Sequence, residues 1–447
     1  MSGSLDMIKK MHANLPWRNT FAIVSNVNKE LPAPVRKWVT GGRRNYSSMP
    51  AVLKMADGTP VTKPEQWPAR RAEILDLFEK YVYGTMPKTG FTTSFEVLAE
   101  SPAFDGAAIL RQVKITVTTE LGSSDALMAL YLPASAAETP APVVFGLNFG
   151  GNHTILEDSA LLDSYAYDKN GTGVALPEGT KVSEEVLASL EKMRAPGGAT
   201  EAWSIEYAIS RGFGMASVYC NDFVPDAPAT WNTRVLSLFE DDNLSAVGGW
   251  AFGLMRMADY LIQDPQVDST KLAVTGHSRL GKAACWAAAC DDRVAVLLSN
   301  DAGCTGSSLS RGNRGETVKS ITTSFPYWFS PNYASYGDNL DDLPVDQHML
   351  LASVAPRRVY VGCAAGDLWA DPQGSWNALM MSRKAFKLLG FDILKQGVTG
   401  SDLMKMPAAD GEAYFSESMG FHVRQGWHAV MKEDWDHYLD FLEQTWA

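Results

Sequence analysis

Residues 274–284 read VTGHSRLGKAA, and this stretch decides the fold. A short apolar run, 271–276, ends at Gly276, and a segment rich in small residues begins near Leu280. Ser278 is therefore predicted to lie in a sharp turn between a strand and a helix. Glycine at 276 permits such a turn, because a side chain there would meet the following helix. The local sequence leaves open a second interpretation, in which Ser278 is an ordinary N-cap of that helix.

A strand, a Gly-x-Ser-x-Gly turn and a helix form the nucleophile elbow of α/β-hydrolases. In this chain the second glycine, Gly281, comes one residue later than usual. Leu280 must therefore pack where the common motif has no side chain. An arginine, Arg279, follows the serine directly. We interpret Ser278 as a nucleophile presented by an elbow of altered spacing.

The segments around the elbow predict an α/β fold. Short continuous apolar runs are typical of strands buried on both faces of a parallel sheet, and they occur at 142–150, 214–220, 271–276, 294–300 and 358–364. Helical patterns alternate with them, at 201–211, 245–263, 280–290, 376–389 and 432–446. Upstream elements are an amphipathic helix at 65–84 and strands at 113–119 and 126–133. This order predicts a three-layer sandwich, with a mostly parallel central sheet flanked by helices.

We expect one catalytic domain preceded by an N-terminal arm. Residues 1–60 lack sustained periodicity and form the arm, and residues 61–447 form the α/β-hydrolase domain. Two long connections, near 151–200 and 302–356, interrupt the alternation of strands and helices. Both leave the carboxyl ends of strands, where open α/β sheets bind ligands. Connections of this length are usually functional.

Composition excludes several function classes. The 447 residues carry a net charge of −12, which disfavours nucleic acid and anionic membranes as partners. No apolar run reaches the roughly 18 residues of a membrane-spanning helix. The first residues lack the apolar core of a signal peptide. The five cysteines, an odd number without a Cys-x-x-Cys pair, predict neither a disulfide framework nor a metal site.

A serine nucleophile of this type needs an acid and a histidine that follow it in the chain. His428 falls in the turn between the last strand-like run and the last helix, from which a histidine can reach an elbow serine. We therefore predict that His428 is the general base. The other histidines precede the serine, adjoin it or lie within regular elements: His12, His153, His277, His348, His422 and His437.

Two aspartates compete as the acid that orients His428 and stabilises its charged form. Asp301 follows the first strand after the elbow helix, and Asp367 follows the next strand. Asp371 is a weaker third candidate. An aspartate after a strand is often only a helix cap, so the case depends on serine, acid and histidine falling in order at strand ends.

A glycine-rich loop, GLNFGGNH at 146–153, follows another buried strand. The backbone N–H groups of Phe149–Gly151, with Gly150 at the centre, are candidates for half of an oxyanion hole. The N–H group of Arg279 would supply the other half.

Taken together, these segments resemble the glucuronoyl esterases, carbohydrate esterase family 15, in their bacterial branch. The elbow GHSRLGKAA is similar to the family signature G-x-S-R-x-G-K, so the late glycine is a feature of the family. The likeness covers roughly residues 50–447 and includes GLNFGGNHT, SNDAGCTGSSLSRGNRGET, TSFPYWF, LPVDQHMLLA, DLWADP and FHVRQGWHAVMKEDW.

The resemblance implies a serine esterase that cleaves esters between 4-O-methyl-glucuronic acid on glucuronoxylan and the alcohols of lignin. It implies no metal and no organic cofactor. By motif, Ser278 is the nucleophile, His428 the base, and Arg279 a support of the oxyanion through its backbone and guanidinium. An arginine there adds positive charge where negative charge develops. Residues that match those holding the glucuronoyl unit are Lys282, one helical turn beyond the serine, Glu316 and Trp369.

The chain also departs from the fungal members. They have a cysteine before the serine and another beside the histidine, where this chain has His277 and, around His428, Trp427 and Ala429. That disulfide is absent, as in the bacterial branch. Family members place the acid after either of the two strands, and this chain has an aspartate at both. We favour Asp367, because it holds the usual hydrolase position, while Asp301 is shorter than the glutamate of relatives that use the earlier strand.

We expect a monomer whose partner is the ester substrate, with no nucleic acid or membrane involved. The family substrate is a polymer outside the cell, so the resemblance implies an extracellular or periplasmic enzyme, although the chain shows no export signal and a cytoplasmic location stays open. One rival interpretation is an acetyl xylan esterase or another carbohydrate esterase with a smaller acyl pocket. Another is a carbohydrate-binding protein on a hydrolase scaffold.

Overall fold

A computed structural model describes most of the chain, namely residues 44, 46–167, 191–391, 406 and 413–446. Most of the predicted arm at 1–60 and the middle of the predicted connection at 151–200 lie outside the described residues.

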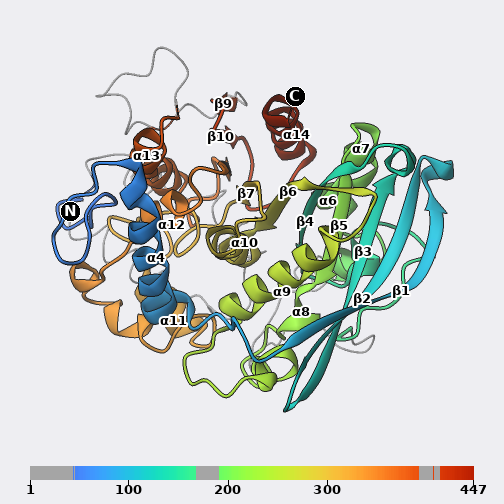
Figure 1. The fold of residues 1–447 in the computed structure, drawn as a ribbon, viewed down its shortest axis with the longest axis horizontal. Helices are drawn as coiled ribbons and strands as arrows, with labels where there is room; N and C mark the ends of the chain where they lie inside the picture. The colour runs from blue at the N-terminus through green and yellow to red at the C-terminus, as the bar shows by residue number, and fades with distance from the viewer. Residues whose placement is uncertain (1–43, 45, 168–190, 392–405, 407–412, 447) are drawn as a thin grey trace.

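Ten strands form the middle layer of the molecule (Figure 1). Their bounds are β1 (Thr92–Ala103), β2 (Ala108–Thr119), β3 (Gly122–Pro133), β4 (Ala141–Asn148), β5 (Gly214–Tyr219), β6 (Val267–His277), β7 (Val296–Asn300), β8 (Arg358–Ala364), β9 (Ala413–Phe415) and β10 (Met419–Arg424). Their spatial order is β1-β2-β3-β5-β4-β6-β7-β8-β10-β9. Neighbours from β5 through β10 run parallel, while β1, β2, β3 and β9 add antiparallel strands at the edges. The predicted apolar runs coincide with β4 to β8.

Helices cover both faces of this sheet. Their bounds are α4 (Trp67–Phe78), α6 (Thr200–Trp203), α7 (Ile205–Ser210), α8 (Cys220–Phe223), α9 (Ala246–Leu261), α10 (Ser278–Cys290), α11 (Val318–Ser324), α12 (Gln347–Ala352), α13 (Pro372–Leu388) and α14 (Lys432–Trp446). One apolar core joins the sheet to α4, α9, α10, α12 and α13, and a second joins its other face to α7 and α14. The predicted three-layer α/β sandwich is therefore confirmed.

Two of the predicted helices differ from the observed ones in detail. The segment 65–84 is helical as expected, but its last turn, Glu79–Tyr83, is a π-helix. The single helix predicted at 201–211 is divided into α6 and α7, because Ser204 adopts a left-handed conformation with φ of 43°. Neither difference affects the sheet edge that carries the site.

Four adjacent parallel strands end together at one edge of the sheet. His277 at the end of β6 pairs with Asn300 at the end of β7. Asn300 pairs with Gly362 of β8, and Arg424 at the end of β10 pairs with Ala364. The segments that follow these four strands contain the predicted serine, both predicted acids and the predicted histidine. The topology therefore brings all four to one edge, as the chain order indicated.

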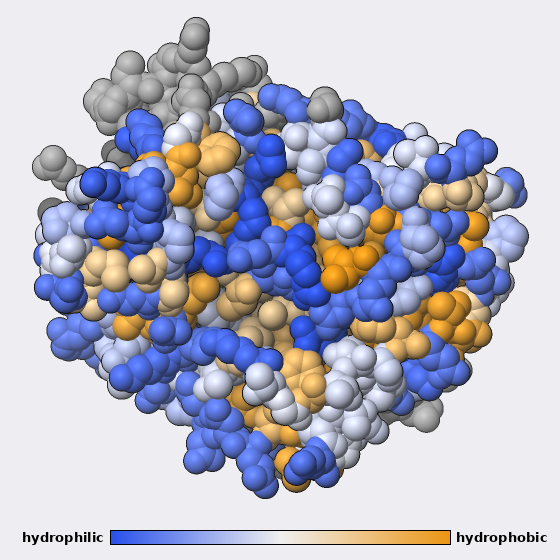
Figure 2. Space-filling model, in the orientation of Figure 1, coloured by the Kyte–Doolittle hydropathy of each residue, from blue (hydrophilic) through white to orange (hydrophobic). Residues whose placement is uncertain are grey.

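The surface is mixed in character. Figure 2 shows a face on which hydrophilic residues predominate and apolar residues form separate patches. Within the described part of the chain, no helix combines the length and the apolar character needed to cross a bilayer. All five cysteines are free thiols, as their number and spacing predicted.

Candidate active site

The turn between β6 and α10 has the geometry of a nucleophile elbow. Ser278 is the first residue of α10 and adopts a φ of 57°, a strained conformation for a residue with a side chain. A Cβ atom on Gly276 would lie 2.3 Å from the carbonyl oxygen of Leu280, so only glycine fits there. A Cβ atom on Gly281 would lie 2.8 Å from the carbonyl oxygen of Gly276. Leu280 packs into the main apolar core, as the altered spacing requires.

The elbow geometry also decides between the two interpretations of Ser278. The N-cap of α10 is His277, whose side chain makes no capping hydrogen bond. Ser278 is therefore not the N-cap that the alternative interpretation requires. It is instead the residue with the strained backbone conformation in the turn.

His428 and Asp367 form a hydrogen-bonded pair next to the elbow strand. Nδ1 of His428 lies 2.5 Å from Oδ2 of Asp367. Because a carboxylate oxygen accepts, Nδ1 carries the proton, and Nε2 is left as the basic nitrogen. The other oxygen, Oδ1, accepts from the backbone N–H of Ala370 at 3.2 Å. Burial lowers the pKa of His428, but the charge and hydrogen bond of Asp367, together with the charge of Asp301, raise that pKa above its ordinary value.

The second acid, Asp301, lies close to the same pair. The structure brings Asp301, Asp367 and His428 together. One side-chain oxygen or nitrogen atom of each residue lies within 4.8 Å of the corresponding atoms of the other two. Oδ1 of Asp301 accepts from the backbone N–H of Ala364 at 2.9 Å. Burial and the charge of Asp367 raise the pKa of Asp301 well above its ordinary value. The three groups could in principle ligate a metal ion, but the short Nδ1–Oδ2 bond suits an acid–base pair.

The third candidate acid lies outside this arrangement. Asp371 is buried and forms an ion pair with Arg44, whose Nη2 donates to Oδ1 at 2.6 Å. Asp371 also occupies the N-cap position of α13. Its carboxylate is therefore engaged by the segment that precedes the domain, rather than by His428.

Sequence reasoning left His277 out of the site, yet its ring packs against His428. The two ring centroids lie 4.3 Å apart. Nδ1 of His277 donates to Oδ1 of Asn300 at 2.8 Å, since an amide oxygen can only accept. Burial and the positive charge that His428 can carry lower the pKa of His277 well below its ordinary value. His277 is therefore a neutral ring beside the predicted base.

A side-chain network fixes the glycine-rich loop after β4. Nδ2 of Asn148 donates to Asn152 at 2.8 Å and to Ser217 at 2.9 Å. Oδ1 of Asn148 accepts from the backbone N–H of Gly151 at 2.8 Å. Of the three candidate oxyanion amides, the Gly151 amide is thus already used within the protein, which leaves the amides of Phe149 and Gly150.

Arg279 lies beside this loop. Its guanidinium carbon is 4.5 Å from the ring centroid of Phe149, a cation–π distance. Nε lies 2.6 Å from Oδ2 of Asp226. The other oxygen of Asp226 accepts from Tyr327 and from the indole of Trp328, both at 2.8 Å. Asp226 was not predicted, because nothing in its sequence neighbourhood distinguishes it from a surface aspartate.

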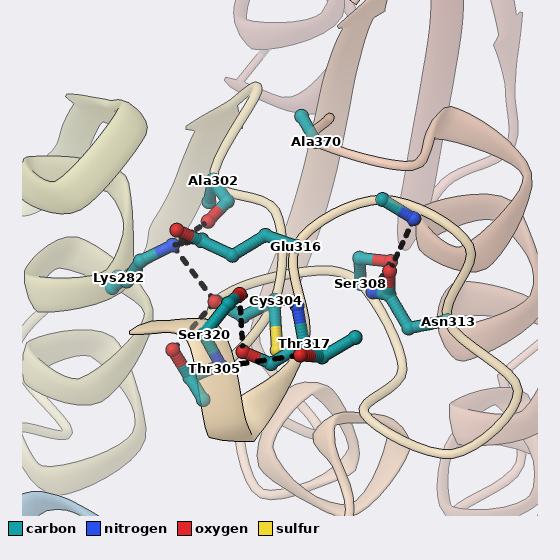
Figure 3. Close-up of polar contacts among 12 residues, drawn as sticks. Lys282, Ala302, Cys304, Thr305, Ser308, Asn313, Glu316, Thr317, Ser320 and Ala370 are labelled. Atoms are coloured by element: carbon teal, nitrogen blue, oxygen red, sulfur yellow. Dashed lines mark hydrogen bonds and ion pairs between the residues drawn. The ribbon is translucent and has the colours of Figure 1, made fainter. Parts of the chain in front are cut away.

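The three residues predicted to bind the sugar are linked by contacts with one another. Figure 3 shows Lys282 beside Glu316, with its ammonium group directed at two backbone carbonyls. Nζ donates to the carbonyl oxygens of Ala302 and Cys304, each at 2.7 Å, and lies 3.6 Å from Oε2 of Glu316. The backbone N–H of Glu316 donates to the carbonyl of Trp369 at 2.9 Å.

Burial and a helix cap hold Glu316 in place. Burial raises the pKa of its carboxyl group, while the charge of Lys282 opposes that shift. The next residue, Thr317, is the N-cap of α11, and its side chain accepts from the backbone N–H of Ser320 at 3.1 Å. The structure thus places Lys282, Glu316 and the backbone of Trp369 close together, and their binding of a sugar stays a prediction.

His348 and His422 hydrogen-bond groups that play no part in the proposed chemistry. Nε2 of His348 hydrogen-bonds the carbonyl of Pro50 at 2.9 Å, and burial lowers its pKa to about 4. His422 is fully buried and donates to Asp434 at 2.8 Å.

An α/β-hydrolase sheet with a serine in a strained elbow, a histidine–aspartate pair and a glycine-rich loop at the same edge defines the class of serine hydrolases. Comparisons with known proteins narrow this class. The family described as "Glucuronyl esterase, fungi" matches residues 213–390. Carbohydrate esterase MZ0003, from an unknown prokaryotic organism, is 37% identical over 406 residues, which are 89% of each chain.

Solved structures agree with this result. The chain is similar to a promiscuous CE15 esterase from a marine bacterial metagenome, with a TM-score of 0.75 and 36% identity over 90% of this chain and 100% of the other. It is also similar to a glucuronoyl esterase from Solibacter usitatus, with a TM-score of 0.78 and 34% identity over 91% and 100%. The chain belongs to carbohydrate esterase family 15, the glucuronoyl esterases, and is a carboxylic ester hydrolase.

Proposed function

We propose that this enzyme hydrolyses esters in which the acid is (4-O-methyl-)glucuronic acid on glucuronoxylan and the alcohol belongs to lignin. The observation that carries this proposal is the cluster of Lys282, Glu316 and Trp369 beside the elbow of Ser278. A site built to hydrogen-bond hydroxyls discriminates against acyl groups that lack them, because its buried polar groups are then left unpaired. An acetyl group has no hydroxyls that this cluster could bind, whereas a uronic acid ring has them.

In the proposed first step, Oγ of Ser278 attacks the ester carbonyl carbon. Nε2 of His428 takes the hydroxyl proton, and the carbonyl oxygen becomes an oxyanion. The N–H groups of Arg279 and Gly150 donate to this oxyanion, and the guanidinium of Arg279 adds positive charge nearby. Donors that are fixed before the reaction stabilise the developing charge without reorganisation.

Collapse of this intermediate breaks the bond to the alcohol, which leaves with the proton from His428. The glucuronoyl group is now esterified to Ser278. Water then attacks, gives its proton to His428 and releases glucuronic acid, and the proton returns to Oγ. Asp367 stabilises the imidazolium in both steps through its bond to Nδ1.

Lys282, Glu316 and Trp369 make different contacts with the sugar in this proposal. Two of the three N–H bonds of the Lys282 ammonium are directed to the carbonyls of Ala302 and Cys304. The third is left for Glu316 and a sugar hydroxyl. The Glu316 carboxylate accepts from a hydroxyl, and Trp369 offers an amphipathic ring face to the pyranose.

Steady-state kinetics on benzyl glucuronate and on an acetylated xylo-oligosaccharide test this function. We expect kcat/KM to favour the glucuronate ester by at least about 100-fold, because only that acyl group engages the cluster. Equal values, or a preference for the acetyl ester, would contradict the glucuronoyl specificity and favour an acetyl esterase.

We also infer that the enzyme acts outside the cytoplasm and as a monomer. The proposed substrate is a cell-wall polymer, which an enzyme meets outside the cell that makes it. Fractionation of the producing cells and light scattering of the purified protein test the two statements. Activity confined to the cytoplasmic fraction, or a stable dimer, would contradict them.

A further inference from the structure

A buried ion pair lies beneath the turn that carries His428. Arg424 ends β10 and Asp434 lies in the first turn of α14, and their side chains are 2% and 0% exposed. Nε of Arg424 donates to Oδ2 of Asp434 at 2.7 Å. Removing two charges from water is costly, and a buried pair is weak evidence for a gain in stability. The position of this pair indicates another role.

The remaining donors of Arg424 are directed mainly at the turn on both sides of His428, and Nη2 also lies 3.9 Å from Oδ2 of Asp301. Nη1 donates to the carbonyl oxygen of Gln425 at 3.0 Å, and Nη2 donates to that of Trp427 at 3.0 Å. Nη2 also donates to the carbonyl oxygen of Ala429. Because the guanidinium is planar and its donors form a rigid fork, these three peptide groups are fixed relative to one another.

The same turn is bonded to the segment that carries Asp367. The backbone N–H of Ala365 donates to the carbonyl of Arg424, and that of Gly366 donates to the carbonyl of Gly426, both at 2.8 Å. A shift of the turn would therefore change the distance between Nδ1 of His428 and its acid. Catalytic groups must be held within about 0.5 Å of their working geometry.

Asp434 is also linked to the imidazole ring of His428 through a second chain of contacts. Its Oδ1 accepts from Nδ2 of Asn300 at 3.1 Å. Oδ1 of Asn300 accepts from His277, whose ring packs on that of His428 with 4.3 Å between centroids. Because Nδ2 donates to a carboxylate, the orientation of the Asn300 amide is fixed. One carboxylate thus anchors both the backbone of the turn and the ring that it presents.

We propose that the Arg424–Asp434 pair is a positioning unit for His428. Arg424 holds the backbone of the turn, and Asp434 holds Arg424 and, through Asn300 and His277, the imidazole ring. This inference rests on the proposed function, in which His428 is the base. Neither Arg424 nor Asp434 contacts the reacting atoms, so loss of the unit lowers kcat and leaves the KM for a glucuronate ester nearly unchanged.

The test uses Arg424→Lys and Asp434→Asn in the full chain. Lysine keeps the charge but lacks the fork. Asparagine keeps the shape but lacks the charge and replaces one of the two accepting oxygens by a donor. We expect each to lower kcat for benzyl glucuronate by about 100-fold, as a small misplacement of a catalytic group can. KM should stay within about twofold, because ground-state binding is untouched.

Arg357→Lys is the matched control. Nη1 of Arg357 also donates to three backbone carbonyls, those of Ala288, Asp291 and Val294, at 2.6, 2.8 and 3.0 Å. Arg357 precedes β8, at the strand end opposite the site. Arg357→Lys should lower the free energy of unfolding by an amount similar to that of Arg424→Lys, because it also removes a guanidinium from buried carbonyls. Its kcat should stay within about twofold of wild type.

Proton NMR distinguishes misplacement of His428 from a general loss of folded structure. The Nδ1 proton that His428 donates to Asp367 should give a far-downfield resonance in wild type and in Arg357→Lys. It should be lost in Arg424→Lys and Asp434→Asn while their circular dichroism remains native. If Arg424→Lys does not fold, the isosteric Asp434→Asn decides the question, and Asn300→Ala tests the second chain of contacts alone.

Folded Arg424→Lys and Asp434→Asn proteins with wild-type kcat and the wild-type resonance would overturn the positioning role. His428→Ala keeps this result distinct from a failure of the proposed function. An inactive His428→Ala beside fully active Arg424→Lys and Asp434→Asn overturns only the positioning role. An active His428→Ala overturns the proposed base itself.

Discussion

Replacing Asp367 by asparagine should lower kcat for a glucuronate ester by about 10²- to 10³-fold. Asp367 accepts the Nδ1 proton of His428 at 2.5 Å. If asparagine turns its amide N–H toward Nδ1, the ring proton moves to Nε2, and no base faces Ser278. The acceptor for the backbone N–H of Ala370 is kept, so the fold should be little changed.

The size of this loss depends on Asp301. In other serine hydrolases the same replacement costs about 10⁴-fold. Here a ligand atom of Asp301 lies within 4.8 Å of the corresponding atom of His428. At an effective dielectric constant of about 20, a carboxylate at that distance stabilises an imidazolium by roughly 3.5 kcal/mol. If Asp301 supplies part of that energy in Asp367→Asn, the loss of kcat is smaller than 10⁴-fold by one or two powers of ten.

The residual activity should carry a pH signature. The charge of Asp367 is one cause of the raised pKa of Asp301, so Asp367→Asn lowers the pKa of Asp301 and lets it ionise as the pH rises. The kcat of Asp367→Asn should therefore increase with pH until Asp301 is ionised, beyond the increase in Asp301→Asn/Asp367→Asn, in which the titration of His428 remains but that of Asp301 does not.

The assay is kcat for benzyl glucuronate from about pH 5 to pH 9, measured for both single variants and the double variant. We expect Asp301→Asn alone to lose less than about tenfold, because Asp367 keeps its bond to His428. A larger loss in Asp301→Asn than in Asp367→Asn would refute the assignment and place the acid after β7. Equal, small losses would mean that the two aspartates share the role.

Three further predictions concern recognition, pH and the N-terminal segment. Lys282→Ala and Glu316→Ala should each lower kcat/KM for glucuronate esters by about tenfold or more, ~1.4 kcal/mol, and affect an aryl acetate much less; equal losses on both substrates would remove the sugar-binding role. Because the pKa of His428 is raised and its neutral form is the base, the acidic limb of kcat/KM should have its midpoint above about pH 6.5, and a lower midpoint would contradict this. Arg44→Gln should lower the free energy of unfolding by about 3 kcal/mol, because it leaves a buried carboxylate unpaired. Lys319→Gln is the control, because it removes an ion pair with Asp338 in which the side chains are 63% and 78% exposed. It should change the free energy of unfolding by less than about 1 kcal/mol, and equal effects of the two variants would contradict the larger contribution of the buried pair.

The parts of the fold that the sequence predicts correctly are those with a strong apolar pattern. The strands β4 to β8 are continuous apolar runs, because helices cover both of their faces. The strand β1 was missed, because its residues alternate between exposed and half-buried positions and include few apolar side chains. The sequence of β9 offers only three residues to a strand prediction.

The site was predictable where chain order and strand ends determine it, as for Ser278 and His428. The choice of acid was not, because Asp301 and Asp367 follow neighbouring parallel strands, and only side-chain geometry shows which one bonds the histidine. His277 was excluded, since adjacent residues of a strand point to opposite sides. The left-handed turn at Ser278 breaks that rule and lets His277 pack on His428.

Arg424 is distinctive in the sequence. It is a charged residue at the end of an apolar strand, in the segment FHVRQGWH, four positions before the predicted base. A charge at such a position is usually paired. Its partner Asp434 could not be identified from the sequence, because acidic residues are common in the first turn of a helix.

The central claim, covalent catalysis by Ser278 on a glucuronate ester, is tested most directly by rapid-quench mass spectrometry. Enzyme is mixed with benzyl glucuronate, quenched within its first turnover and digested. The account predicts one added glucuronoyl group on the peptide that contains Ser278, and no adduct with Ser278→Ala, whose kcat should fall by about 10⁵-fold or more. An adduct on a different residue, or a Ser278→Ala variant that keeps a tenth of the wild-type kcat, would contradict it.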